Sequence, residues 1–190
     1  MVPISFHDFF TASAGAGAAL VGLLFVAISI APERTVLHSA PLQRQVTASS
    51  TFTAMLNAFF ISLVALVPGY NLSIIVLIMG SMAFVSSITL GWHLLREQRR
   101  NAKPGTSLAS VFLILAGLGL YGYELAQGFQ LVLHPGDIGL VKVVVGIIVA
   151  VYGLGLARAW ELLGAQRYNL LARLSAQRDL DQQDDAKSTQ

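Results

Sequence analysis

Residues Phe9–Ile30 have the sequence FFTASAGAGAALVGLLFVAISI and contain no Lys, Arg, Asp or Glu. An α-helix of this length is about 33 Å long, which is enough to cross a hydrocarbon core of about 30 Å. The first half of the stretch consists almost entirely of small residues, and the second half mostly of large apolar ones. The stretch therefore predicts a transmembrane helix.

The small residues of this stretch predict close packing against other helices. Ala14, Ala18 and Gly22 recur at four-residue spacing on one face of the helix. In lipid, small side chains let two helix backbones approach closely, so that van der Waals contact can hold them together. We expect this helix to be the packing centre of a bundle. The expected packing residues are Ala14, Gly15, Gly17, Ala18 and Gly22, joined by Gly146 and Gly153 near the C-terminal end.

The composition of the whole chain is typical of a polytopic membrane protein. Of the 190 residues, 55% are hydrophobic and 12% are charged, and the formal net charge is only +2. A net charge this small gives no reason to expect a nucleic acid as partner. The chain has no cysteine, which excludes disulfides, thiolate catalysis and cysteine-ligated metals.

Five segments are long and apolar enough to cross a bilayer. They are residues 9–30, 46–67, 72–95, 107–133 and 138–163. Pro68-Gly69 and Pro135-Gly136 stand at the centres of two of the breaks, and Pro followed by Gly favours a type II turn. The sequence therefore predicts an all-α fold, a polytopic transmembrane bundle of five helices within residues 1–163.

The distribution of basic residues predicts the orientation of this bundle. Lys and Arg occur after the first and third segments and in the C-terminal region, but not after the second or fourth. The positive-inside rule then places the N-terminus outside and the C-terminus inside a bacterial inner (plasma) membrane. Aromatic residues near the segment ends fit as interfacial anchors. These are Phe6, Phe9, Phe10 and Tyr70 outside, with Trp92 and Trp160 inside.

Helical periodicity continues beyond the fifth segment through residues 164–180. Leucines share one face there and arginines flank it, which predicts a cytoplasmic amphipathic extension that continues straight or lies on the membrane surface. Residues 181–190 are polar, and we expect them to be disordered. The arginines enforce topology or bind anionic lipid headgroups. They are Arg158, Arg167, Arg173 and Arg178.

Residues 14–20 and 22–30, together with Leu66-Val67-Pro68-Gly69, resemble a family of small, uncharacterised bacterial polytopic membrane proteins. Members of that family are often labelled as modulators of the FtsH protease. The resemblance covers only part of the chain, is mostly helix-packing sequence, and assigns no functional residue.

Glu124 is the only acidic residue deep inside a predicted span. A carboxyl near the membrane midplane is costly to ionise, which makes it a candidate for function. Side chains tilt toward the N-terminus of their helix, so Glu124 leans inward while Lys142, on the next helix, leans outward. We therefore expect Asn57 to be the partner of Glu124, and Lys142 to reach the outer surface. The alternatives for Glu124 are a structural hydrogen bond and an ion or proton pathway.

Ser49, Thr53 and Asn57 form a polar stripe at four-residue spacing on the second segment. Such a stripe can line a wet pore or join helices by hydrogen bonds, and we favour the second role. Two imidazoles and two carboxylates on the predicted outer side could bind Zn²⁺, but turn chemistry accounts for them without a metal. These residues are His7, Asp8, His134 and Asp137.

The chain contains no HExxH, GxSxG or P-loop motif. We therefore predict an integral membrane protein without enzymatic activity and without a cofactor. It would act by self-assembly as a homo-oligomer, or by binding a membrane protein partner. The alternative is a small oligomeric ion channel or transporter that uses Glu124 and the polar stripe.

Overall fold

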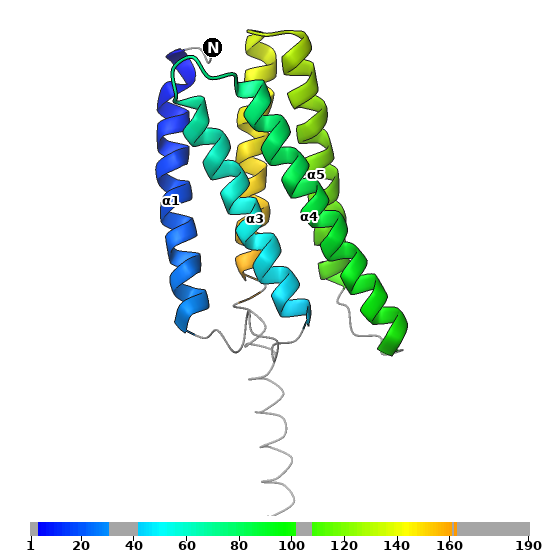
Figure 1. Cartoon of the computed structure of the whole chain (residues 1–190). Helices are drawn as coiled ribbons and strands as arrows, with labels where there is room; N and C mark the ends of the chain where they lie inside the picture. The colour runs from blue at the N-terminus through cyan, green and yellow to red at the C-terminus, as the bar shows by residue number, and fades with distance from the viewer. Residues whose placement is uncertain (1–3, 31–41, 102–107, 161, 163–190) are drawn as a thin grey trace, which may run out of the picture.

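The computed structural model describes residues 4–30, 42–101, 108–160 and 162. Its elements in chain order are η1 (Ile4–Phe6), α1 (His7–Ile30), α3 (Leu42–Ala65), α4 (Leu72–Asn101), α5 (Leu108–Leu133) and a last helix, Ile138–Trp160. The described residues form no strand, and the long helices run side by side as one bundle (Figure 1). The predicted all-α helical bundle is therefore confirmed, whereas the predicted extension 164–180 and tail 181–190 lie outside the described residues.

Within the described residues, four helices are long and apolar enough to cross a membrane, namely Ile4–Ile30, Arg44–Ala65, Leu72–His93 and Ile138–Trp160. α5 is not one of these four, although its 26 residues would make a helix about 39 Å long. The fold is thus a membrane-type helical bundle, and the fifth span stays a prediction.

Two tight turns lie at one end of the bundle, beside the beginning of α1 (Figure 1). In the first turn Tyr70 N–H donates to the Val67 carbonyl at 3.3 Å, and Gly69 has a φ of 82°. In the second, Asp137 N–H donates to the His134 carbonyl at 3.3 Å, and Gly136 has a φ of 94°. Proline followed by a glycine of positive φ is the pattern of a type II turn, as the sequence predicts.

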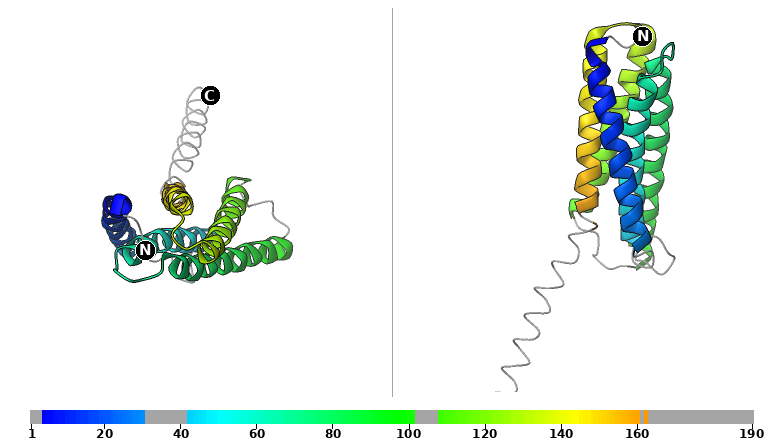
Figure 2. Two further views of the ribbon diagram at one scale, coloured as in Figure 1. Left: turned by 90° about the horizontal axis from the view of Figure 1, so that it is seen from above. Right: turned by 90° about the vertical axis from the view of Figure 1, so that its left-hand side faces the viewer.

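The core is formed by side chains from all five long helices. α1 packs against α3, α3 against α4, and α4 against α5. The last helix completes the bundle beside α1 and α5, as the two views of Figure 2 show. The buried apolar cluster includes Phe10, Ile61, Val76, Tyr121 and Ile148. Phe10, expected as an interfacial anchor, is fully buried because it lies on the same face of α1 as the other core residues.

The packing face of α1 differs from the predicted one. Its buried residues are Phe10, Ser13, Ala14, Gly17 and Leu24, which follow the 3.6-residue period of an α-helix. A strict four-residue repeat advances by 400° per step and so drifts around the helix by about 40° each time. For this reason the predicted stripe leaves the core after its first residue, Ala14.

At several of the predicted packing glycines, an added Cβ would therefore meet no other helix in the described chain. Gly17 is buried against the Phe59 Cβ, which would lie 3.0 Å from an added Cβ, and against the Tyr152 hydroxyl. At Gly15 and Gly22, by contrast, no heavy atom lies within 4 Å of an added Cβ, and Ala18 is exposed. The same open space surrounds the exposed glycines of the last helix, Gly146 and Gly153.

Candidate functional site

Glu124 and Asn57 form a buried pair in the interior of the bundle. Glu124 of α5 is 1% exposed and Asn57 of α3 is 3% exposed. The Asn57 Nδ2 group donates to Glu124 Oε1 at 3.1 Å and to Oε2 at 3.2 Å. Lys142 is exposed on the last helix. The partner expected from the side-chain directions, Asn57, is therefore the one observed.

A glycine of α4 makes room for this pair. A Cβ added at Gly80 would lie 3.3 Å from Glu124 Oε1 and 3.4 Å from its Cδ. Any larger residue at this position would press on the carboxyl group. The α4 backbone thus closes one side of the site at short range. Sequence reasoning missed Gly80, because only the relative register of α4 and α5 brings it to this level.

A cavity of about 200 Å³ lies between α3 and α4, and Asn57 is one of its lining residues. We call it the Asn57 cavity. The carbonyl oxygen of the amide, Asn57 Oδ1, is buried and has no hydrogen-bond partner in the described part of the chain. The lining residues are Thr53, Leu56, Asn57, Phe60, Met79, Met82, Ala83 and Ser86.

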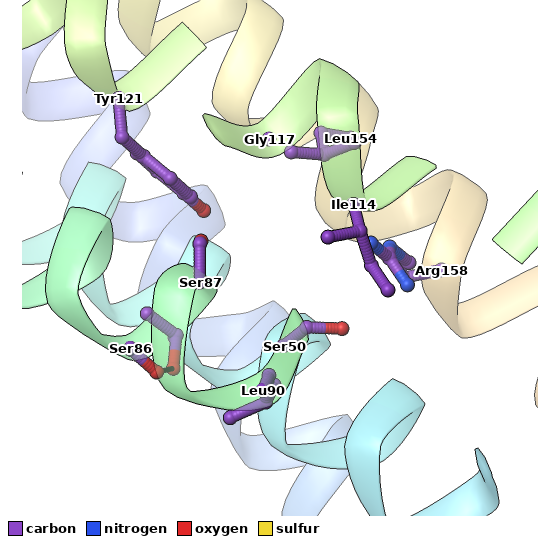
Figure 3. Close-up of a pocket in the computed structure, with 10 residues that line it drawn as sticks. Ser50, Ser86, Ser87, Leu90, Ile114, Gly117, Tyr121, Leu154 and Arg158 are labelled. Carbon is purple, nitrogen blue, oxygen red and sulfur yellow. Dashed lines mark hydrogen bonds between the residues drawn. The ribbon is translucent and has the colours of Figure 1, made fainter. Parts of the chain in front are cut away.

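A second, smaller pocket is lined by residues of α3, α4, α5 and the last helix (Figure 3). We call it the Arg158 pocket. Its internal volume of about 20 Å³ has room for about one water molecule. In Figure 3 the hydroxyl groups of Tyr121 and Ser87 point toward each other across it. It is lined by Ser50, Thr53, Ser86, Ser87, Leu90, Ile114, Gly117, Tyr121, Leu154 and Arg158.

The two pockets share Thr53 and Ser86, whose hydroxyl oxygens lie 3.5 Å apart. Polar side chains therefore follow one another from Arg158 through these hydroxyls to Asn57 and Glu124. Of the predicted stripe, Thr53 and Asn57 line this path and Ser49 is exposed. Ser50 takes the place of Ser49 on this face. It precedes Thr53 by three residues and Asn57 by seven, and residues at such intervals share one face of a helix.

Arg158 departs from its predicted role at the lipid headgroups. It is 3% exposed and points into the bundle, on the same face of the last helix as the buried residues Val151 and Gly155. The prediction considered only that Arg158 lies near the end of the helix, and not which face of the helix it occupies. The other arginines expected at the membrane surface, Arg167, Arg173 and Arg178, lie outside the described residues.

A second polar cluster joins α1, α3 and the last helix. Ser62 Oγ donates to the Ala58 carbonyl at 2.7 Å, so its bond of 2.7 Å with Ser13 Oγ uses the Ser13 proton. The Tyr152 hydroxyl donates to the Ser13 carbonyl at 2.8 Å. These contacts connect three helices and leave the Glu124 site untouched, so their role is structural.

The residues considered for Zn²⁺ are exposed at the end of the bundle that carries the turns. Asp137 caps the last helix, since its Oδ1 accepts the Gly139 N–H at 2.7 Å. Within the described ranges no three His, Cys, Asp or Glu residues are grouped as metal ligands.

Comparisons with family models, curated proteins and solved structures find no match to this chain. The resemblance of residues 14–30 to proteins labelled as FtsH modulators therefore stays a prediction from the sequence.

Proposed function

We propose that this chain is a non-enzymatic, five-span protein of the bacterial inner membrane that acts by self-assembly. The observation that carries the proposal is a row of small residues on the outside of the last helix. Gly146, Ala150, Gly153 and Ala157 are all exposed, and an added Cβ at either glycine would meet no atom within 4 Å. Gly146 and Ala150 are four residues apart, as are Gly153 and Ala157. Pairs of small residues at this spacing let another helix approach closely in lipid. We call this row the outer seam.

A second set of exposed small residues on α1 supports the same proposal. Gly15, Ala19 and Gly22 lie on the face of α1 that points away from the bundle. α1 and the last helix are neighbours (Figure 2). The bundle therefore offers two neighbouring helices with small residues that its own packing leaves unused, which favours contact with a second copy.

The orientation belongs to the same proposal. The two turns and the start of α1 share one end of the bundle, and neither turn contains Lys or Arg. Arg44 and Arg96 lie near the other end, at the beginning of α3 and late in α4. By the positive-inside rule, the end with the turns is outside.

Single cysteines test the contact, because the natural chain has none. Ala150→Cys or Gly153→Cys in native membranes should form disulfide-linked dimers on mild oxidation. Val85→Cys on α4 and Phe129→Cys on α5 are exposed controls away from the outer seam, and they should cross-link weakly. Equal cross-linking at all four positions, or none at the seam, would contradict self-assembly through it.

Ion conduction is a second candidate, and the line of polar groups from Arg158 to Glu124 favours it. A carboxyl inside a membrane helix is a functional candidate because it is costly to keep there. Glu124→Gln separates the two functions, since the amide keeps an acceptor for Asn57 Nδ2 and removes the titratable group. A folded variant that retains self-assembly and shows the parent's proton flux in proteoliposomes supports assembly alone. A folded variant whose flux is lost supports conduction.

A further inference from the structure

Arg158 places a permanent positive charge in the interior of the bundle. Its side chain is 3% exposed and lines the Arg158 pocket, and Figure 3 shows the guanidinium group reaching from the last helix toward this space. A guanidinium stays protonated in proteins and carries several N–H donors in a planar fork, with no acceptor. Because these donors point in different directions, Arg158 can donate into the pocket while it keeps another partner. The pocket therefore has one cationic wall.

Two hydroxyl groups add neutral donors to the same space. The Tyr121 and Ser87 hydroxyls point toward each other across the pocket (Figure 3), and neither makes a hydrogen bond within the described part of the chain. The Ser50 hydroxyl, by contrast, donates its proton to the Thr47 carbonyl at 3.0 Å. Tyr121 and Ser87 therefore offer their protons to a molecule or ion in the pocket.

The charge of the lining favours an anion. No Asp or Glu is among the residues that line the pocket. Glu124 does not belong to this lining, and both of its carboxyl oxygens accept from Asn57. In the interior of a bundle the effective dielectric constant is low, so the attraction between Arg158 and an anion is stronger than in water. A neutral water molecule gains no such attraction between full charges, and a cation is repelled.

The size of the pocket limits this anion to a single atom. The volume of about 20 Å³ exceeds only slightly the roughly 10–15 Å³ that one water molecule requires. Sulfate, phosphate and carboxylates contain several heavy atoms and do not fit. A halide ion is only slightly larger than a water molecule. The remaining walls come from the apolar side chains of Leu90, Ile114 and Leu154, and they suit a weakly hydrated halide better than a strongly hydrated ion.

We propose that the Arg158 pocket binds one halide ion, which in a cell is chloride. The guanidinium group supplies the balancing charge, and the Tyr121 and Ser87 hydroxyls donate to the ion from α5 and α4. This inference goes beyond self-assembly and does not depend on it, because all the lining residues belong to one chain and the outer seam is on the outside of the bundle. It also concerns binding alone and requires no passage of ions through the bundle.

The melting temperature of the full chain in a zwitterionic detergent tests the proposal. The probes are sodium chloride and sodium bromide, compared with sodium gluconate at the same ionic strength, since gluconate is too large for the pocket. A halide at about ten times its dissociation constant should raise the melting temperature by about 3–6 °C relative to gluconate. A parent protein that melts equally in all three salts overturns the proposal and indicates that the pocket holds water.

Gly117→Ala fills the pocket without disturbing its walls. An added Cβ would lie 3.5 Å from Leu154 Cδ2, 3.8 Å from Tyr121 Cε2 and 4.0 Å from Ser87 Oγ, which are ordinary contact distances. The methyl group therefore takes up space that the ion requires, and the shift between halide and gluconate should be lost. Gly119→Ala on the same helix is the matched control, because no atom lies within 4 Å of an added Cβ there, and it should keep the shift.

Tyr121→Phe removes one donor and keeps the shape of the side chain. The halide concentration that gives a chosen shift should rise about tenfold, as expected for the loss of one hydrogen bond to a charged group. Tyr123→Phe is the matched control, since Tyr123 is 50% exposed and does not line the pocket. A full shift that persists in either pocket variant overturns the proposal and indicates a general effect of salt on the protein surface.

Discussion

At the scale of single residues, the bundle holds its buried carboxyl through one amide and one glycine. Asn57 donates to both carboxyl oxygens of Glu124. Gly80 lets α4 lie close to this carboxyl, since a Cβ added at Gly80 would lie 3.3 Å from Glu124 Oε1. The pair connects α3 to α5, which are not consecutive in the chain. A hydrogen bond of this kind between membrane helices contributes about 0.6 kcal/mol on average.

Replacement of Gly80 should destabilise the bundle by direct overpacking. A leucine there must displace the Glu124 carboxyl or the Leu125 side chain, and overpacking of this kind costs about 1–3 kcal/mol. Gly119→Leu on α5 is the matched control, because no atom lies within 4 Å of an added Cβ at that position. Size-exclusion after stepwise heating in detergent should show a lower melting temperature for Gly80→Leu only; equal melting of the two variants would contradict the close approach.

The effect of replacing Glu124 on the stability of the bundle should depend on whether the new side chain keeps a hydrogen-bond acceptor. Glu124→Gln still accepts the Asn57 Nδ2 proton, and its melting temperature should stay close to that of the parent. Glu124→Leu leaves a buried Nδ2 group without an acceptor, at a cost of about 1–3 kcal/mol. The same heating series measures both variants. If Glu124→Leu were as stable as Glu124→Gln, the bond between Asn57 and Glu124 would contribute nothing to the fold.

The chemistry of this pair was predictable from the sequence, but its surroundings were not. The depth of Glu124 and the tilt of helix side chains were enough to favour Asn57 over Lys142. Gly80, Ser86 and Arg158 reach the site through the relative rotation of α4 and the last helix. Those rotations depend on packing between elements, which periodicity within one element does not determine.

At the scale of elements, glycines on the same helix have opposite roles. Gly17 lies against Phe59 and Tyr152, whereas Gly22 faces open space. The composition of residues 9–30 predicted a helix with small residues at its contacts. A four-residue repeat could not identify the contact face, because the helical period is 3.6 residues. The Pro-Gly turns, by contrast, are set by local backbone preference and were predicted correctly.

Gly17→Leu and Gly22→Leu should therefore behave differently. A leucine at residue 17 must separate α1 from α3 and break the hydrogen bond between Tyr152 and Ser13, so we expect loss of the folded bundle in detergent. A leucine at residue 22 should leave the monomer intact. Far-ultraviolet circular dichroism and elution volume measure both effects. A Gly17→Leu protein that elutes and melts like the parent would show that this face of α1 is assigned wrongly.

At the scale of the whole molecule, the topology can be tested by chemical labelling. Single cysteines at Ser5 in η1, at Asn71 after the first turn and at His134 in the second turn should react with an impermeant maleimide in intact cells. These three segments share the end proposed to be outside. A cysteine at Ala102 should react only after the cells are opened. Labelling of Ala102 in intact cells, together with protection of Asn71, would reverse the orientation.

Self-assembly through the outer seam is the central claim, and the mass of the particle in native-membrane nanodiscs tests it most directly. The parent chain should have a mass of two or more copies. The double variant Gly146→Leu/Gly153→Leu should have the mass of one copy and keep the helical content of the parent, because both positions are open to the outside within the single chain. A parent protein that is already monomeric, or a double variant that remains an oligomer of the same mass, would contradict the claim.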